Sequence, residues 1–316
     1  MKVFYGLHAL RRPFPRPVVT LGAFDGIHRA HQSLLRRIIQ RSHRLGGTSI
    51  LLTFHPHPVK VLKPRTSFTA LTCLPHRLKL LDSLGLDVCV VIPFTKHLSR
   101  LSASSFIKKF LVEKLRIREL WVGFDYVFGK GRRGNFRLLK KQGRRYGFAV
   151  RRLAEMKYRG TLYSSTRIRT LVAKGNLAEA TRFLGRPHSL YGTVVRGRGR
   201  GKRLGCPTAN LRPCHDAIPP RGVYAVTAFL QGKKRARPYL GILNIGYRPT
   251  FEKRKAQVIE VHLLDYRGTL YGKKMEVSFL KRIRPEKKFK SAEALMTRIR
   301  CDERAARRLR NTPKLF

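Results

Sequence analysis

Short apolar runs alternate with helical patterns over about the first 180 residues of this 316-residue chain. An alternation of this kind predicts a parallel sheet with helices on both faces. The expected strands cover residues 18–21, 49–54, 88–92 and 119–122, and the expected helices cover residues 32–39, 76–84, 102–115, 167–175 and 177–184. Ligands of such sheets bind beyond the carboxyl ends of the strands. We therefore expect an α/β domain with its site along that edge.

The pattern changes after about residue 190, where strand-like segments follow one another with turn signals and without long helices between them. They cover residues 191–195, 222–230, 239–245, 258–264 and 275–280. This arrangement predicts a small antiparallel barrel, against which a helix over about 291–309 would pack. The break at Gly185-Arg186-Pro187 marks the boundary between the two domains, which gives a first domain over 1–185 and a second over 186–316.

The net charge is extreme, because 69 lysines and arginines stand against 17 acidic residues, for +52. Such a composition favours nucleic acid or another anionic partner. The basic residues, however, are spread along the whole chain. A general compositional bias of the proteome explains this spread better than selection for one polyanionic partner. A basic nucleic-acid-associated protein remains an alternative, and the glycine–arginine patch over 196–203 is its main support. A hydrophobic content of 42% excludes global disorder.

The five cysteines are odd in number and irregularly spaced, and no Cys-x-x-Cys pair occurs. This excludes a zinc ribbon and a Cys-x-x-Cys redox pair, and it favours a reducing compartment. No apolar run has the length of a signal peptide or of a membrane span. We therefore expect a soluble cytoplasmic protein that makes no contact with a membrane.

Two histidines, His28 and His31, stand at the start of the first expected helix, behind a glycine-bearing turn over 22–26. Amides at a helix N-terminus favour an anion, and histidines can donate to a phosphoryl group. A spacing of three differs from the i, i+4 pair that binds zinc on a helix. The pattern thus favours a phosphate site over the alternative of two histidines in a solvated turn.

Three further polar segments could join this motif, namely residues 53–58, 123–130 and 164–169. Two of them follow expected strands, and the third caps a helix. Together they offer amides, hydroxyls, histidines and arginines, which can hold a nucleoside triphosphate and stabilise charge on its phosphates. None of them carries an evident covalent nucleophile. We therefore expect in-line attack of one bound substrate on another, assisted by positioning.

In the second domain, the segment over 205–211 (GCPTANL) follows the glycine–arginine patch. Its glycines would let backbone amides approach phosphates. Thr208 and Asn210 could place oxygens on one Mg²⁺. A turn is expected over 244–251, after a strand. Glu260 lies in a strand pattern and is a candidate general base, although an outward-facing residue paired with an arginine or lysine remains the alternative.

These motifs occur in a fixed order: Gly-x-Phe-Asp-Gly-x-His, Gly-Phe-Asp-Tyr, Ser-Ser-Thr-x-Ile-Arg, Pro-Thr-Ala-Asn, Asn-Ile-Gly-x-Arg-Pro-Thr-Phe and Glu-x-His-Leu-Leu-Asp. In this order the chain resembles the bacterial bifunctional riboflavin kinase/FMN adenylyltransferase (FAD synthetase) family over nearly its whole length. The resemblance implies an α/β nucleotidyltransferase-like domain with a Rossmann-like parallel sheet, then a small antiparallel flavokinase-like β-barrel with a C-terminal helix.

The resemblance also implies an ATP-dependent transferase with two activities. The second domain would convert riboflavin and ATP to FMN and ADP, and the first would convert FMN and ATP to FAD and diphosphate, with Mg²⁺ as cofactor. His28, His31 and Arg167 would be catalytic in the first reaction site, and Glu260 in the second. Further residues would bind ATP or its phosphates (Gly22, Phe24, Asp25, Gly26, Ser164, Ser165, Gly197, Gly199 and Gly205), the flavin (Asp125, Tyr126, Phe128 and Arg248) or the metal (Thr208 and Asn210).

Four positions depart from the family pattern. Ala30 stands where glycine is usual, His55 where an acidic residue is common, Val127 where a polar or basic residue is usual, and Cys206 where phenylalanine is usual. The first three lie in the domain expected to be the adenylyltransferase. At position 30, a methyl group would crowd a nucleotide that approaches the backbone. A flavokinase with an impaired adenylyltransferase half is therefore a further alternative.

Overall fold

The computed structural model describes residues 1–197, 206–231, 238–248 and 256–310. It divides into two compact units, the first made of Met1–Phe68 and Leu74–Ser164, and the second of Thr69–Cys73 and Ser165–Phe316. The short segment Thr69–Cys73 is joined to the second unit by a disulfide between Cys73 and Cys214, a pairing that the irregular cysteine spacing did not indicate.

The first unit contains a six-stranded parallel sheet in the order β1-β4-β3-β2-β5-β6. Its strands are β1 (Lys2–Tyr5), β2 (Val18–Leu21), β3 (Ser49–His55), β4 (Val88–Pro93), β5 (Glu119–Val122) and β6 (Ala149–Arg152). The chain moves outward from β2 to one side through β3 and β4, and then returns to the other side through β5. The order therefore reverses between the neighbouring strands β2 and β5, and a crevice at their carboxyl ends is the expected binding place.

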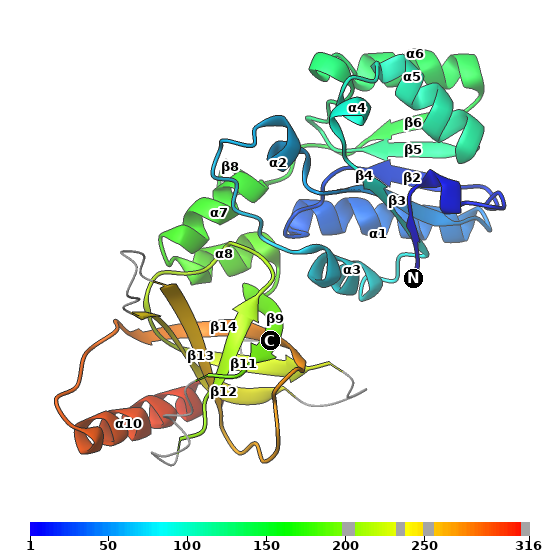
Figure 1. The fold of residues 1–316 in the computed structure, drawn as a ribbon. Helices are drawn as coiled ribbons and strands as arrows, with labels where there is room; N and C mark the ends of the chain where they lie inside the picture. The colour runs from blue at the N-terminus through cyan, green and yellow to red at the C-terminus, as the bar shows by residue number, and fades with distance from the viewer. Residues whose placement is uncertain (198–205, 232–237, 249–255, 311–316) are drawn as a thin grey trace. The chain divides into compact units, whose positions relative to one another are not determined.

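Helices cover both faces of this sheet, as predicted (Figure 1). Val18 of β2 packs with α1 (Arg29–Arg44) and α3 (Leu74–Asp82), whereas the next residue, Val19, packs with the opposite layer. That layer consists of α5 (Ala103–Phe106), η2 (Ile107–Lys114) and α6 (Phe136–Tyr146). Shorter elements complete the unit: η1 (Leu7–Ala9), α2 (Pro58–Leu62), α4 (Lys96–Ser99), η3 (Lys130–Arg132), β7 (Lys157–Tyr158) and β8 (Thr161–Leu162).

The second unit begins with α7 (Ser165–Ala173) and α8 (Leu177–Leu184) and continues into a closed antiparallel barrel in the order β10-β13-β12-β11-β14-β9. The strands are β9 (Ser189–Val195), β10 (Ala209–Pro213), β11 (Gly222–Leu230), β12 (Tyr239–Arg248), β13 (Ala256–Leu263) and β14 (Lys274–Arg284). The predicted fold class, a parallel α/β sheet followed by a small antiparallel barrel, is thereby confirmed. Strand β12 continues through Arg248, so the turn expected from residue 244 onward is wrong over 244–248.

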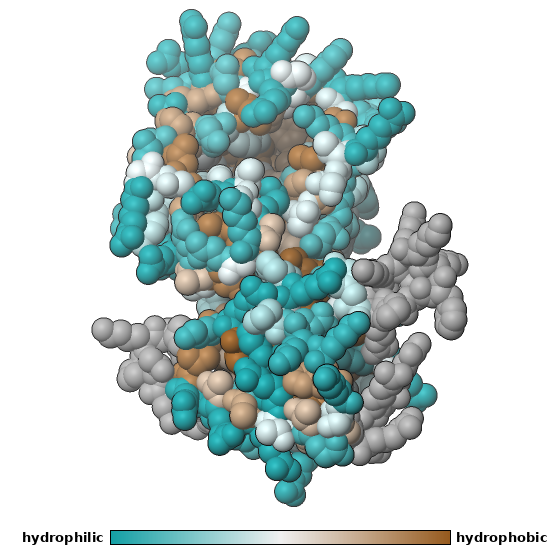
Figure 2. Space-filling view, turned by 90° about the vertical axis from the view of Figure 1, so that its left-hand side faces the viewer, coloured by the Kyte–Doolittle hydropathy of each residue, from teal (hydrophilic) through white to brown (hydrophobic). Residues whose placement is uncertain are grey.

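The C-terminal helix α10 (Ala292–Arg310) packs on the outside of the barrel (Figure 1). Its Ala306 is fully buried against Ala225 and Ile242, which lie on the outer faces of β11 and β12. A buried ion pair between Asp302 and Arg284 of β14, 2.8 Å apart, adds a polar connection. The described residues include no helix long and apolar enough to cross a membrane. Hydrophilic side chains project over both units on the face drawn in Figure 2.

One buried carboxylate ties α1 to the sheet of the first unit. Glu119 of β5 is 3% exposed and accepts hydrogen bonds from both Arg41 Nε, at 2.8 Å, and Trp121 Nε1, at 3.1 Å. Arg151 of β6 lies 3.5 Å from the carboxylate oxygen that accepts from Trp121. Burial alone would raise the pKa of Glu119, but the hydrogen bonds from Arg41 and Trp121 and the nearby positive charges outweigh it, so this pKa lies below its usual value.

We expect Glu119→Gln to lower the free energy of unfolding by about 2 kcal/mol at pH 7, because the amide cannot accept the charge-assisted hydrogen bonds. Since the folded-state pKa is depressed, the carboxylate stabilises the fold above the pKa of the unfolded glutamate, and this contribution disappears as the pH falls through the folded pKa. Urea unfolding at pH 7 and at acidic pH measures the difference. Glu113→Gln, at an exposed position, is the control, and an equal loss in both variants would contradict the assignment.

Candidate active sites

The turn that follows β2 has an unusual backbone. Between the end of β2 and the start of α1, the φ angles are positive at Phe24 (49°), Gly26 (80°) and Ile27 (41°). Glycine adopts such angles freely, whereas for the two larger residues they are unfavourable and need support from the surrounding structure. Backbone strain of this kind is concentrated at functional sites. The turn therefore has a shape that its surroundings must maintain.

Residues from two other elements provide this support. Arg77 of α3 is 4% exposed, and its guanidinium donates to the carbonyl oxygens of Ala23 in the turn and of Phe54 in β3. The hydroxyl of Thr53 donates to the same Ala23 oxygen at 3.3 Å. Burial lowers the pKa of Arg77, and the nearby Asp25 acts against this shift. Arg77 was not among the predicted site residues, because an arginine within a helical pattern carries no signal that it is buried.

The structure brings His28, His31 and Phe24 together at the N-terminus of α1. His28 is the N-cap residue, and its Nδ1 accepts the backbone N–H of His31 at 3.4 Å. In the neutral ring the proton then lies on Nε2, which makes this nitrogen the donor. The two imidazoles stack with their centres 3.6 Å apart, and the ring of Phe24 lies 4.6 Å from that of His31. A hydrogen-bond donor is thus fixed beside the helix N-terminus, where an anion is favoured.

His31 is held in its neutral form. Burial, and secondarily the charge of Arg77, lower its pKa from 6.5 to about 3. Its Nδ1 is buried without a hydrogen-bond partner among the described residues. An imidazole that stays neutral at physiological pH can still donate one hydrogen bond, but it does not add a positive charge to the site.

The segment after β5 lies at the neighbouring strand end. Asp125 is exposed there, while Tyr126 and Phe128 are half-buried with their rings stacked 5.5 Å apart. Both aromatic rings pack against the core below the sheet edge, and burial raises the pKa of Tyr126. Because β5 pairs with β2, this segment and the histidine turn begin at adjacent strand ends. One face of the first unit is hollowed in Figure 2, and hydrophobic side chains line the hollow.

The predicted serine–arginine motif falls at the junction of the two units. Ser164 is the last residue of the first unit, whereas Ser165 and Arg167 belong to α7 of the second. Arg167 is exposed and forms an ion pair with Glu179 of α8, at 3.1 Å. Glu179 also accepts a hydrogen bond from Asn176, the N-cap residue of α8, at 2.9 Å. Within the second unit, Arg167 therefore has a carboxylate partner that an anionic ligand would have to replace.

Three polar residues form a row across the outside of the barrel. Asn210 of β10 and Asn244 of β12 both stand directly opposite Glu260 of β13 in the strand register. All three are half-buried, whereas the flanking Ile259 and Val261 of β13 are buried at 3% and 1%. Side chains alternate along a strand, so the row faces outward while its neighbours fill the barrel. Asn244 was not among the predicted site residues, although it lies in one of the motifs.

The remaining predicted residues of the second domain surround this row in part. Thr208 is half-buried and immediately precedes β10. The backbone of Gly197 lies so close to the Asn210 amide that a Cβ atom there would overlap it. Arg248 ends β12, and nothing is described of its side chain. Gly199 and Gly205 lie outside the described residues.

The neutral state of His31 can be tested by titration. We expect its imidazole carbon and proton resonances to stay unchanged from pH 8 to pH 5, because its pKa of about 3 lies below this range. The folded ring binds a proton less readily than the unfolded one, so stability falls as the pH drops below about 6.5, the usual histidine pKa. Heteronuclear NMR, with His31→Gln to assign the resonance, measures this, and a midpoint near 6.5 would contradict burial of the ring.

Comparison with known proteins assigns a family to each of the two units. A family model for FAD synthetase matches residues 12–167, and a model for riboflavin kinase matches residues 184–310. Bifunctional riboflavin kinase/FMN adenylyltransferases from Pseudomonas fluorescens and Escherichia coli K12 are both 37% identical to the chain, over 98% and 97% of its length and the same shares of theirs.

A solved structure of a Streptococcus pneumoniae protein, described as a macrolide-efflux protein, superimposes with a TM-score of 0.83. It is 28% identical, and the match covers 97% of this chain and 99% of that one. The likeness extends through both units of the fold. The family models and the near full-length relatives both pair an FAD synthetase unit with a riboflavin kinase unit. The chain belongs to the bifunctional riboflavin kinase/FMN adenylyltransferase family.

Proposed function

We propose that the barrel phosphorylates riboflavin to FMN with ATP, and that the parallel-sheet unit then joins FMN to the AMP moiety of a second ATP to give FAD and diphosphate. The observation that carries this proposal is the row Asn210–Glu260–Asn244, which presents one carboxylate between two amides on the outer face of the barrel. A carboxylate in this setting suits proton abstraction from a hydroxyl group.

In the kinase step, Glu260 accepts the proton of the ribityl 5′-hydroxyl while that oxygen attacks the γ-phosphorus of ATP. The bond from the γ-phosphorus to the bridging oxygen breaks, and ADP leaves. The flanking amides of Asn210 and Asn244 hold the carboxylate and the reacting groups in place. Arg248, at the end of β12, is proposed to contact the flavin.

Thr208 and Asn210 are the proposed Mg²⁺ ligands. A hydroxyl and an amide oxygen are hard donors of the kind Mg²⁺ prefers, so these residues fit the ion. When bound, the ion would neutralise charge on the ATP phosphates. The backbone of Gly197 packs closely on Asn210 and therefore lies beside the proposed Mg²⁺ ligands. We propose that Gly197, Gly199 and Gly205 contact the phosphates of ATP.

In the adenylyl transfer, an FMN phosphate oxygen attacks the α-phosphorus of ATP, and the bond to diphosphate breaks. His28 donates from Nε2 to the α-phosphoryl oxygens, and the amides of α1 add favourable partial charge. His31 stacks on His28 and fixes its ring, and it is proposed to donate its own N–H to the phosphates. The turn residues Gly22, Phe24, Asp25 and Gly26 would shape the ATP site.

Ser164, Ser165 and Arg167 are proposed as a second phosphate group, in which Arg167 would exchange Glu179 for a phosphate. Asp125, Tyr126 and Phe128 are proposed to bind the flavin of FMN. We also propose that the functional boundary lies near residue 185, at the start of the range matched by the riboflavin kinase model. Both steps are proposed to take place in the cytoplasm, where ATP is available.

Two single substitutions should separate the activities. We expect Glu260→Gln to slow FMN formation from riboflavin roughly 100-fold or more, because the general base is lost, while FAD formation from supplied FMN continues. We expect His28→Ala to slow FAD formation by about 100-fold, through loss of one donor to the transition state, while FMN still accumulates. Chromatography of flavins after incubation with Mg-ATP measures both.

Glu293→Gln, at an exposed carboxylate on α10, is the matched control and should leave both rates unchanged. If Glu260→Gln retains the wild-type rate of FMN formation, Glu260 is not the base. If the wild-type protein makes FMN but no FAD, the first unit is impaired, and Ala30 is the residue to revert to glycine.

A further inference from the structure

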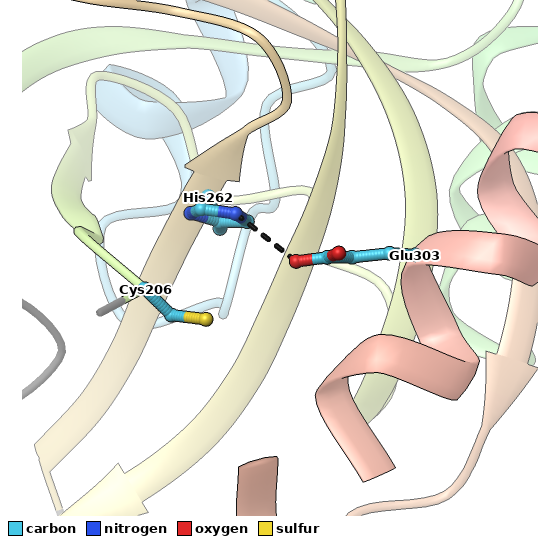
Figure 3. Close-up of side chains that lie close together, drawn as sticks. All are labelled: Cys206, His262 and Glu303. Carbon is cyan, nitrogen blue, oxygen red and sulfur yellow. Dashed lines mark ion pairs between the residues drawn. The ribbon is translucent and has the colours of Figure 1, made fainter. Parts of the chain in front are cut away.

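A second polar cluster lies on the barrel, beside the row that we assign to the kinase step. Cys206 lies shortly before β10, His262 lies on β13, and Glu303 lies on α10. Their side chains point toward one another from these three elements (Figure 3). One ligand atom from each, namely a sulfur, a ring nitrogen and a carboxylate oxygen, lies within 4.8 Å of the other two. The predicted roles of the kinase residues do not involve this cluster.

The orientation of the histidine is the most informative feature of the cluster. Nδ1 of His262 lies 2.9 Å from the carbonyl oxygen of Pro207. A carbonyl can only accept, so Nδ1 carries the hydrogen. In the neutral ring, Nε2 therefore presents its lone pair, and it faces Glu303 at 3.3 Å. Histidines that bind metals are usually oriented in this way, with the second ring nitrogen donating to a backbone carbonyl.

The distances also approach those of a metal site. In a tetrahedral zinc site, Zn–N and Zn–O bonds of about 2.0–2.2 Å place a nitrogen and an oxygen ligand about 3.4 Å apart. The observed 3.3 Å between His262 and Glu303 fits this value. A thiolate with a longer bond would lie about 3.6 Å from either ligand. Since the sulfur already lies within 4.8 Å of both ligand atoms, one side-chain rotation can bring Cys206 into range.

The surroundings suit a metal that is partly sheltered. Cys206 is 7% exposed, and the side chains of His262 and Glu303 are 16% and 26% exposed. A water molecule can therefore complete four ligands. A thiolate and a carboxylate together balance the charge of a divalent ion. Sulfur is a soft donor that Mg²⁺ avoids, whereas zinc-class ions accept sulfur, nitrogen and oxygen together.

We propose that Cys206, His262 and Glu303 form a binding site for a zinc-class divalent transition metal, distinct from the Mg²⁺ site of the kinase step. The bound ion would join α10 to the segment that leads into β10, and would so fix the backbone around Pro207 and Thr208. The proposal does not depend on the proposed reactions, since it concerns metal binding in the absence of ATP and flavin.

Cobalt(II) titration of the chelator-treated, full-length protein tests the site. We expect one equivalent of cobalt to produce a thiolate-to-cobalt charge-transfer absorption, together with the strong visible bands of four-coordination. Cys206→Ser should abolish the charge-transfer band, and His262→Gln and Glu303→Gln should each weaken binding roughly tenfold or more. The matched control is Cys301→Ser, which removes a free thiol outside the cluster and should leave the spectrum unchanged. Excess Mg²⁺ should not displace the cobalt.

Thermal unfolding supplies a second readout that does not rely on a spectrum. Because an ion that binds only the folded state stabilises it, zinc should raise the melting temperature of the wild type and of Cys301→Ser, but not that of Cys206→Ser. If cobalt binds without a charge-transfer band, or if the band survives in Cys206→Ser, the proposal is overturned. His262 and Glu303 would then form only an ion pair between β13 and α10.

Discussion

The register of β13 between β10 and β12 is the constraint on which the chemistry of the barrel depends. Ile259 and Val261 fill the interior, so Glu260 and His262 must point outward. A slip of one residue would turn every side chain of the strand to the other face, and would place a carboxylate and an imidazole among apolar residues. The hydrophobic core therefore fixes the position of the polar residues, although it does not contact the substrates.

In the first unit, buried hydrogen-bond donors rather than strand register fix the position of the site residues. Its histidine turn has an unfavourable backbone, and buried donors from β3 and α3 support it at the carbonyl of Ala23. Gln32 of α1 supports it at the carbonyl of Ile27. The strand before it is buried on both faces of the sheet, so the turn starts from a rigid base. Arg77 both holds the turn and helps to keep His31 neutral. Its removal would thus disturb the shape and the electrostatics of the site together.

Much of this arrangement can be predicted from the sequence. The alternation of apolar runs with helical patterns predicts the parallel sheet, because each buried strand needs helices on both faces, and the motif order places the site residues at strand ends. Strands β1, β6 and β10 were not predicted. The first two lie at the edges of the sheet, where the burial pattern is weaker, and β10 ends in a proline. The buried guanidinium of Arg77 and the Cys73–Cys214 disulfide were also missed. Both depend on which distant segments pack together, and local sequence does not record that.

Cys206 shows how a single side chain can add a metal ligand to the barrel without a change in the fold. The family resemblance leads us to expect phenylalanine at this position. A thiol is smaller and brings a soft donor beside His262 and Glu303. Cys206 stands two positions before Thr208, and His262 stands two positions after Glu260. Two cation sites of opposite preference would therefore lie about 7 Å apart along β13. Hard oxygen donors on one side and sulfur on the other keep the two ions from competing.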